Sequence, residues 1–405
     1  MVLFVRGVLA EGIRRGASDV HFEPRSQAFC IRFRIDGVLS DFVERPIEDY
    51  EKVVSAVKVL ADLDIAEHVL PQDGHIELVL QQIDERVNVA GAPQAQGAQP
   101  VRVSPPASDR YYDIRVSFFP SVNGEVLVMR ILNRASALLS VEELGMDATS
   151  LERLRNLLVT SYGMVLITGP TGSGKTTTLY SVMSALKSEE RNIITLEDPI
   201  EFHLDWMRQC EIREERGFTF ERAMSSVLRQ DPDVLMVGEI RDPATAEYAV
   251  RSALVGRIVG STIHANTTIG TIARLLDLGI SRSLVANSIQ GIVAQRLVRR
   301  ICEKCKVPYT PQQAHLAHFG LDQVTQVFYR GNGCAVCNGT GYKGRTGIFS
   351  VMLFSDEIRS LIFEQHSLSE VQDVAIQEGM RTLKMDAAIK ITTGITTVEE
   401  AIHVV

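Results

Sequence analysis

Long apolar runs are missing from this 405-residue sequence. No stretch approaches the roughly 18 uncharged apolar residues that a membrane-spanning helix needs. The opening run from Met1 to Val5 is interrupted by Arg6 and Glu11 and has no basic leader, so it does not resemble a secretory signal. We therefore expect a cytoplasmic chain without membrane spans.

An excess of positive charge is also missing. The sequence has 42 Lys and Arg against 50 Asp and Glu, a net charge of −8, which disfavours a protein that coats nucleic acid by bulk charge. The hydrophobic share of 45% and the charged share of 23% exclude a wholly disordered, collagen-like or coiled-coil chain. The length favours two or three folded domains.

Cysteine is sparse, and its six residues do not suit a disulfide framework in a chain without a secretory signal. Four of them form two CxxC pairs, Cys302 with Cys305 and Cys334 with Cys337. Paired knuckles of this kind suit a tetrahedral zinc site, because each wraps backbone amides around two thiolates. An iron–sulfur cluster and four reduced thiols are the alternatives. The Gly-rich surroundings are poor in long apolar runs and so need something other than a hydrophobic core to hold them, which favours structural zinc.

The first 132 residues predict a mixed α and β domain. Helical spacing over residues 2–13 is followed by strand-like alternation, and Asp36 and Gly37 supply a hairpin turn. Residues 90–108 consist mainly of Ala, Pro, Gln, Gly and Ser, and predict a flexible excursion between strands. We place Cys30 on a strand and Cys210 in a loop, and assign a function to neither.

The rest of the chain divides into four predicted segments. Residues 133–146 predict a linker, and residues 147–301 alternate short apolar runs with helical segments, which favours a largely parallel sheet covered by helices. Residues 302–344 are rich in Cys and Gly and predict the zinc knuckle. Residues 345–405 are predicted to form a carboxy-terminal helical region, with helical periodicity from Leu353 onward.

A phosphate-binding loop follows the apolar run of residues 165–168. Residues 169–176 spell GPTGSGKT, the GxxxxGK[ST] pattern between a strand and a helix, and this context argues against a mere Gly-rich turn. Backbone amides would face phosphate oxygens, Lys175 would reach the outer phosphates, and Thr176 would bind magnesium. The predicted nucleotide-binding residues are Gly169, Pro170, Thr171, Gly172, Ser173, Gly174, Lys175, Thr176 and Thr177.

Three further apolar runs are each followed by a titratable side chain: Glu197, Glu239 or His264. Ligands of open α/β sheets bind outside the carboxyl ends of the strands, so we expect these groups to share one edge with the phosphate loop. Asp233 precedes its strand and should lie at the opposite end.

The chemistry predicted for this edge is in-line attack of water on the γ-phosphate of ATP, driven by positioning and charge neutralisation. Glu197 would orient or deprotonate the water and Glu239 would act near magnesium, although the sequence leaves open which carboxylate does which. His264 is a candidate sensor of the γ-phosphate or of a neighbouring subunit. Solvated carboxylates and a structural histidine are the alternatives.

Nine motifs carry a resemblance that spans nearly the whole chain. They are GASDVHFEP (16–24), RIDGVL (34–39), LPQDGHI (70–76), DIRVS (113–117), GPTGSGKTTTLY (169–180), TLEDPIEF (195–202), LRQDPDVLMVGEIRD (228–242), AQRLVR (294–299) and GYKGRTGIF (341–349). The sequence resembles the type II secretion and type IV pilus assembly ATPase family, of the GspE and PilB type, with the competence motor ComGA close by.

The resemblance implies a RecA-like P-loop ATPase domain at residues 147–301 and a PAS-like α+β domain at residues 1–132. It implies a homo-hexameric ring that converts ATP hydrolysis into domain rotation against an inner-membrane platform protein, at the inner face of the cell membrane. The implied cofactors are ATP, Mg²⁺ and Zn²⁺. The resemblance also implies that Arg115 and Arg130 reach the γ-phosphate, whereas the residues alone favour exposed strand charges.

Two departures from the family accompany the resemblance. Arg257 stands where many relatives have a histidine, which puts a two-histidine sensor in doubt. The family's separate amino-terminal docking domain has no counterpart, so either recruitment to the membrane differs or the sequence is a shortened form. The four-cysteine knuckle is typical of the GspE and PilB branches and disfavours a retraction motor.

Two other functions compete with the assembly motor. One is a RecA-like nucleic-acid motor that holds DNA with the zinc knuckle and the adjacent basic residues, and the other is a nucleotide-gated scaffold with slow turnover. The DNA hypothesis rests on Arg296, Arg299, Arg300, Lys304 and Lys306, which lack an aromatic stacking platform. We therefore expect no nucleic-acid partner.

Overall fold

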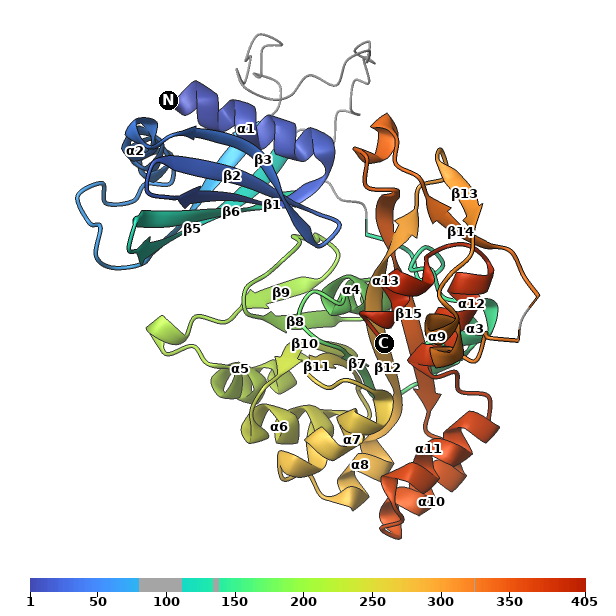
Figure 1. Cartoon of the computed structure of the whole chain (residues 1–405). Coiled ribbons are helices and arrows are strands. Elements are labelled where there is room, and N and C mark those ends of the chain that lie inside the picture. Colours follow the sequence, from blue (N-terminus) through green and yellow to red (C-terminus); the bar gives the residue numbers. More distant parts are fainter. Residues whose placement is uncertain (80–110, 134–137, 324) are drawn as a thin grey trace. The chain divides into compact units, whose positions relative to one another are not determined.

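The computed structural model describes residues 1–79, 111–133, 138–323 and 325–405 (Figure 1). Within this part of the chain the residues form two compact units, Met1–Ala137 and Leu138–Val405. The boundary falls inside residues 133–146, the segment predicted as a linker. The predicted flexible excursion at residues 90–108 lies outside the described residues.

The first unit packs helices against an antiparallel sheet whose strand order is β3-β2-β1-β6-β5-β4. Its elements are α1 (Val2–Arg15), β1 (Ala17–Pro24), β2 (Ala28–Ile35), β3 (Val38–Pro46), η1 (Ile47–Asp49), α2 (Tyr50–Leu60), β4 (Gln72–Val79), β5 (Tyr111–Ser121) and β6 (Gly124–Asn133).

Alternation along the strands divides this sheet into two faces. On β1, Val20 and Phe22 are fully buried in a core shared with α1 and α2, while His21 points to the opposite face. The predicted hairpin turn at Asp36 and Gly37 is confirmed, because both residues have positive φ angles, 50° and 86°, as a type I′ turn requires.

The second unit is built on a mainly parallel sheet of order β15-β12-β7-β11-β10-β8-β9, in which β12 and β15 are antiparallel. Its elements to β11 are α3 (Ala148–Leu158), β7 (Gly163–Thr168), α4 (Lys175–Ala185), β8 (Ile193–Glu197), β9 (Arg208–Glu211), η4 (Glu214–Arg216), α5 (Phe220–Val227), η5 (Leu228–Gln230), β10 (Val234–Ile240), α6 (Pro243–Leu254) and β11 (Ile258–Ile263). They continue with α7 (Thr268–Asp277), α8 (Arg282–Ser288), β12 (Ile289–Ile301), β13 (Lys306–Tyr309), α9 (Gln313–His318), β14 (Phe328–Gly331), η6 (Ala335–Cys337), β15 (Tyr342–Leu353), α10 (Asp356–Phe363), α11 (Leu368–Gln377), α12 (Leu383–Thr392) and α13 (Val398–Ile402).

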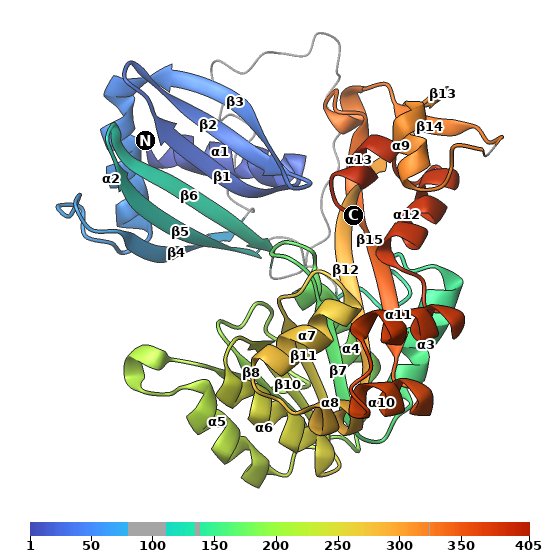
Figure 2. The ribbon, with the colours of Figure 1, turned by 60° about the horizontal axis from the view of Figure 1, so that its bottom comes forward.

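Helices cover both faces of this sheet (Figure 2). On β7, Val165 and Ile167 pack against α3 and α4, while Met164 and Leu166 belong to the core that contains α5 to α8, α10 and α11. The strands are therefore buried on both sides, as parallel sheets require. This arrangement confirms the predicted α/β class.

Two details of the prediction are wrong. The carboxy-terminal region predicted as helical, residues 345–405, begins with β15, and its helices start only at Asp356. Both faces of residues 347–352 are buried, and a short continuous apolar run does not distinguish a buried strand from a buried helix. Cys210 lies on β9 rather than in a loop. Among the described helices, none combines the length and apolarity that crossing a bilayer requires.

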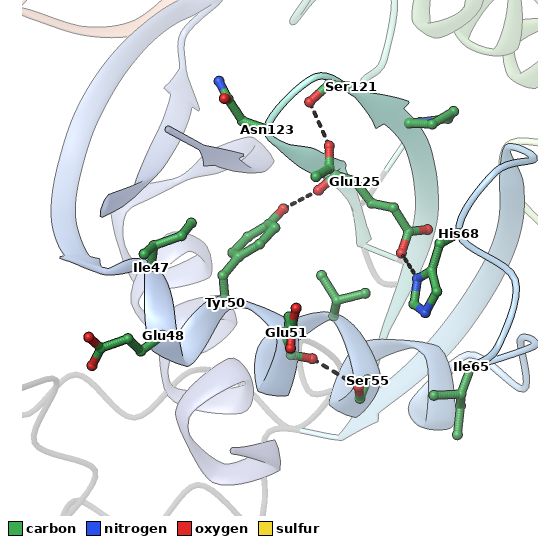
Figure 3. Close-up of a pocket in the computed structure, with 13 residues that line it drawn as sticks. Ile47, Glu48, Tyr50, Glu51, Ser55, Ile65, His68, Ser121, Asn123 and Glu125 are labelled. Atoms are coloured by element: carbon green, nitrogen blue, oxygen red, sulfur yellow. Dashed lines mark hydrogen bonds and ion pairs between the residues drawn. The ribbon is translucent and has the colours of Figure 1, made fainter. Parts of the chain in front are cut away.

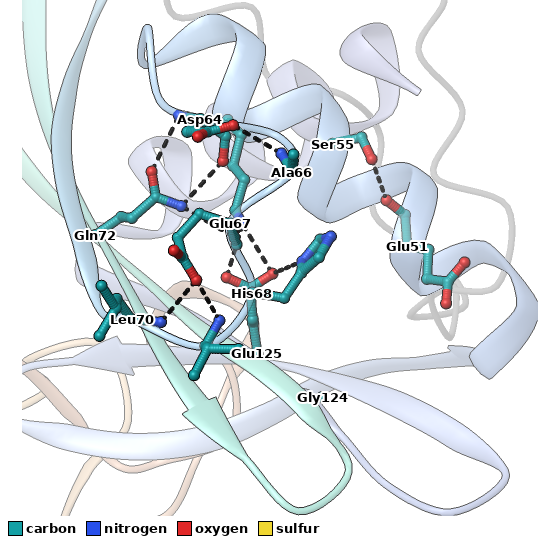
Figure 4. Close-up of polar contacts among 12 residues, drawn as sticks. Glu51, Ser55, Asp64, Ala66, Glu67, His68, Leu70, Gln72, Gly124 and Glu125 are labelled. Carbon is teal, nitrogen blue, oxygen red and sulfur yellow. Dashed lines mark hydrogen bonds and ion pairs between the residues drawn. The ribbon is translucent and has the colours of Figure 1, made fainter.

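A buried ion pair joins α2 to β6 in the first unit. The ammonium of Lys58, on α2, is fully buried and lies 2.8 Å from Oε1 of Glu125, whose side chain is 6% exposed. Lys58 also donates to the main-chain oxygen of Glu67, and the ring of His68 lies 2.7 Å from Glu125 Oε2 (Figure 4). The pair therefore fixes residues 61–71 against β6.

Replacement of the buried carboxylate should destabilise the first unit. In Glu125→Gln the Lys58 ammonium loses its counter-charge, and we expect a loss of about 3–5 kcal/mol in the free energy of unfolding. Urea unfolding followed by hydrogen exchange of β5 and β6 measures it. The control, Glu44→Gln, breaks an exposed pair with Arg25, with side-chain exposures of 57% and 50%, and should cost less than about 1 kcal/mol. Equal losses in both variants would contradict the prediction.

Candidate functional site

The phosphate-binding loop connects the end of β7 to the start of α4 (Figure 1). Gly172 and Gly174 have φ angles of 77° and 87°, in the left-handed region that glycine adopts without strain. A Cβ atom on Gly174 would lie 2.7 Å from Nε2 of Gln295, so the close approach of β12 also requires glycine there. The loop residues Thr171 and Thr176 are exposed to solvent.

Lys175 is 8% exposed and folds back onto the loop itself. Its ammonium donates to the main-chain oxygens of Gly169, at 2.8 Å, and Pro170, at 3.1 Å. Burial lowers the pKa of Lys175, while the negative charge of Glu239 acts in the opposite direction. The phosphate loop therefore holds a partly desolvated cation whose acceptors are main-chain oxygens.

Glu239 lies near the carboxyl end of β10, where the register with β11 shifts between Val237 and Ile240. It accepts a hydrogen bond from Arg241, and its Oε2 lies 3.4 Å from Nε2 of His264, which follows β11. The sequence pattern predicts that this strand ends before Glu239, but β10 continues through Ile240. The irregularity re-aims the side chain at the strand end, as bulges do beside functional sites.

The four predicted strand ends meet at one edge. The parallel pairings β7 with β11, β11 with β10 and β10 with β8 place the phosphate loop, His264, Glu239 and Glu197 at the carboxyl ends of adjacent strands. Asp233 lies at the other end, where its carboxylate accepts from the backbone N–H of Asn192 at 2.7 Å. Both parts of the strand-end prediction are confirmed.

Glu197 differs from Glu239 in its surroundings. It is only 3% exposed, and it accepts hydrogen bonds from the side chains of Thr195, Gln209 and Tyr180. Glu239 has a side chain that is 20% exposed and contacts charged groups. The carboxylate of Glu197 is therefore buried among uncharged donors, whereas that of Glu239 is more exposed and lies beside charged groups.

Gln295, on β12, is not among the site residues that the sequence predicts. Its Oε1 accepts from Thr178 of α4 at 2.6 Å, and its main-chain oxygen accepts from the buried guanidinium of Arg296 at 3.0 Å. Arg296 also donates to the main-chain oxygen of Asn266 at 2.9 Å. These contacts fix α4 and the segment after β11 to β12. The available signal was a Gln-Arg pair directly after the apolar run of residues 292–294.

The basic residues of the DNA hypothesis differ in their surroundings. Arg296 is buried, Arg299 pairs with Glu400 at 2.6 Å and lies over a tyrosine ring, and Lys306 lies 3.6 Å from Glu303. A groove that binds a nucleic-acid backbone needs cations that face solvent. Arg300 and Lys304 are exposed, so two of the five cations behind the DNA hypothesis face solvent.

Arg115 and Arg130 face each other as cross-strand partners on β5 and β6 of the first unit. Asp19 of β1 stands opposite Arg130, whose Nε donates to Asp19 Oδ1 at 3.0 Å, and Arg34 lies 3.8 Å from Oδ2. This row lies on the sheet face opposite α1 and α2. The structure thus brings the two predicted arginines together and partners one of them with an aspartate.

The predicted metal ligands Cys302, Cys305, Cys334 and Cys337 lie where the ladder of β12 and β15 extends beyond β7 (Figure 1). The first pair follows β12 and the second precedes β15, so the antiparallel pairing of these strands brings both pairs together. All four sulfur atoms lie within 4.8 Å of one another.

Sulfur separations within the cluster match tetrahedral coordination. They are 3.9 Å for Cys302 with Cys334, 3.8 Å for Cys305 with Cys337 and 3.7 Å for Cys334 with Cys337. Zinc–sulfur bonds of about 2.3 Å place tetrahedral ligands roughly 3.8 Å apart. Burial opposes ionisation of Cys337, but backbone N–H groups of Cys334 and Gly341 and the neighbouring thiols lower its pKa to about 6, whereas burial raises the pKa of Cys305 to about 11. The cluster fits a thiolate-bound metal ion.

A separate cavity of about 650 Å³ lies in the first unit between α2 and the turn joining β5 to β6 (Figure 3). Its wall includes Tyr50, Ser55 and Ser121, whose hydroxyl hydrogens go to main-chain oxygens of the unit itself. None of the predicted site residues lines it. This cavity therefore has no part in the predicted chemistry.

Comparison with known proteins identifies the family. The family model described as "type II/IV secretion system protein" matches residues 1–104 and 99–403. Type II secretion system protein E of Pseudomonas aeruginosa is 41% identical over 405 residues, which cover 100% of this chain and 75% of that protein. The chain belongs to the type II/IV secretion system protein family. This result confirms the resemblance found in the sequence.

Other members of the family and solved structures agree. Type IV pilus assembly ATPase PilB of Myxococcus xanthus is 40% identical over 406 residues, covering 99% of this chain and 67% of that protein. The crystal structure of the pilus retraction motor PilT with bound ADP has a TM-score of 0.62 at 25% identity, over 98% of this chain and 96% of that one. The ATPase DotB of Legionella pneumophila, at 19% identity, shares the fold with a TM-score of 0.67 over 100% and 95% of the two chains.

The phosphate loop and the family together establish the class of enzyme. The chain is an ATP hydrolase of the secretion and pilus assembly kind.

Proposed function

We propose that the chain is a hexameric ATPase motor that drives assembly of a type II secretion pseudopilus or a type IV pilus. Domain rotation against an inner-membrane platform protein would deliver the work, at the cytoplasmic face of the membrane. The observation that carries the proposal is the convergence of the phosphate loop, Glu239 and His264 at one sheet edge. The relatives from secretion and pilus systems support the cellular task.

Two compact units suit such a motor, because rotation needs bodies that move as wholes. In the proposal, residues 147–301 form the RecA-like ATPase core of the second unit and residues 1–132 form the PAS-like domain of the first. Arg115 and Arg130 would supply positive charge to the γ-phosphate. Charge placed where it develops in the transition state is the main source of catalysis in phosphoryl transfer.

Each side chain at the sheet edge has a role in this proposal. Lys175 exchanges its carbonyl partners for phosphate oxygens when ATP binds. Thr176 and Glu239 hold Mg²⁺, which neutralises phosphate charge when bound. Glu197 orients the attacking water, and His264, beside Glu239, senses the γ-phosphate.

Two variants should separate nucleotide binding from hydrolysis. Lys175→Ala removes the cation that meets the phosphates, so ATP affinity should fall at least tenfold and hydrolysis should be lost. Glu239→Gln keeps the loop intact, so ATP should still bind while turnover falls at least a hundredfold. Fluorescent-nucleotide titration and phosphate release measure the two effects.

Lys187→Ala is the matched control, because Lys187 lies over the ring of Trp206 outside the phosphate loop. It should leave affinity and turnover unchanged. Unaltered ATP affinity in Lys175→Ala would refute the assignment of the loop.

Turnover should depend on assembly. If arginines of the first unit complete the site within a ring, ATPase activity per chain should rise with protein concentration as rings form, and DNA should not change it. Arg130→Ala should lower turnover at least tenfold at saturating ATP. Steady-state turnover and light scattering over the same concentration range test this. Turnover that is constant with concentration but increases with DNA would favour the nucleic-acid motor instead.

The four-cysteine cluster is proposed to hold one structural zinc ion per chain. Cys302→Ser should lose the metal and increase hydrogen exchange over residues 302–344, while ATP affinity stays the same because the phosphate loop lies elsewhere. Elemental analysis after reducing purification measures the zinc content. The control Cys210→Ser, on β9, should keep the zinc. Native protein without zinc would contradict the proposal.

A further inference from the structure

A hydrogen-bond network holds the carboxylate of Glu197, and the role proposed above for Glu197 does not involve this network. It is 3% exposed at the end of β8. Its Oε1 accepts from Thr195 Oγ1 at 2.6 Å and from Gln209 Nε2 at 3.1 Å, and its Oε2 accepts from the hydroxyl of Tyr180. An ionised carboxylate has about four acceptor positions. Among the described residues, three donors occupy three of these positions, and the fourth position, on Oε2, the oxygen that Tyr180 contacts, stays open.

Tyr180 belongs to the helix that carries the phosphate loop. It is fully buried on α4, whose first residues are Lys175 and Thr176. Burial and the neighbouring Glu197 charge raise the pKa of its phenol, so the hydroxyl stays protonated and donates. Its ring meets the ring of Phe202 edge-on, with centroids 5.5 Å apart. A movement of α4 therefore moves the donor that orients Glu197.

Gln209 links the same carboxylate to the segment after β8. Its Nε2 donates to the main-chain oxygen of Phe202 at 2.7 Å, and its Oε1 accepts from the N–H of Leu204 at 2.7 Å. Residues 202–204, β9 and α4 thus surround one carboxylate. Each of these hydrogen bonds involves a side chain in a buried or partly buried site, where orientation is set more strictly than in water.

We propose that Tyr180 is a positioning residue, which fixes the Oε2 position where Glu197 receives the attacking water and couples that position to the phosphate-binding helix. The inference rests on the proposed function, in which Glu197 orients water. Without the hydroxyl, Oε2 has two open positions and the carboxylate loses the bond that ties it to α4. Nucleotide binding by the loop does not involve this hydroxyl.

The test uses the full chain at saturating magnesium-ATP. Tyr180→Phe removes only the hydroxyl, and we expect kcat to fall about ten- to a hundredfold while KM for ATP stays within about twofold. Tyr248→Phe is the matched control, because Tyr248 of α6 is a partly buried tyrosine of the same unit. It should leave both constants unchanged.

Thr195→Val provides a graded comparison, because Oε1 keeps its bond from Gln209 and Oε2 keeps its bond from Tyr180. Its loss in kcat should be smaller than that of Tyr180→Phe. A larger loss would overturn the inference, since the position on Oε2 would then not be the decisive one. Melting temperatures and nucleotide affinity of each variant show whether the fold and the phosphate loop are intact.

A double-mutant cycle separates the inference from the proposed function. In a Glu197→Gln background, Tyr180→Phe should change kcat less than about twofold, because both substitutions act on one interaction. If Glu197→Gln is slow but Tyr180→Phe has normal kcat, the inference fails and the role of Glu197 stands. If Glu197→Gln turns over normally, the role proposed for Glu197 fails.

Discussion

The parallel registration of β7, β11, β10 and β8 is the constraint on which the candidate site depends. Four strands that run in the same direction end at one edge of the sheet, and groups from distant parts of the chain meet there. Apolar residues on both faces of each strand maintain this alignment, because a shift in register would expose them. The hydrophobic core therefore sets the geometry of the polar site.

Three buried charged groups, one in the first unit and two in the second, are matched with partners. Glu197 accepts from surrounding donors, Lys175 donates to the phosphate loop, and Lys58 is paired with Glu125 in the first unit. Each arrangement offsets the desolvation of a charge. In the second unit the same contacts also link elements, since Tyr180 joins α4 to the end of β8. The site is thus held by its neighbours and has little freedom of its own.

Much of the candidate site can be predicted from the sequence, because strand ends and the GxxxxGK[ST] pattern are local features. Glu239 and His264 lie at the edge where short apolar runs placed them. Contacts between elements that are distant in sequence leave no such local pattern. The bond between Tyr180 and Glu197 and the approach of Gln295 to the phosphate loop depend on which helix and strand become neighbours. The strand at the start of residues 345–405 was missed because a run buried on both faces has no period that separates strand from helix.

The carbonyl partners of Lys175 also bear on how nucleotide is exchanged. Lys175 is 8% exposed, and an ammonium that is buried without an acceptor is costly. The main-chain oxygens of Gly169 and Pro170 stand ready to accept its hydrogens. In the proposed motor, the ammonium of Lys175 would then exchange phosphate oxygens for these main-chain oxygens when ADP and phosphate are released.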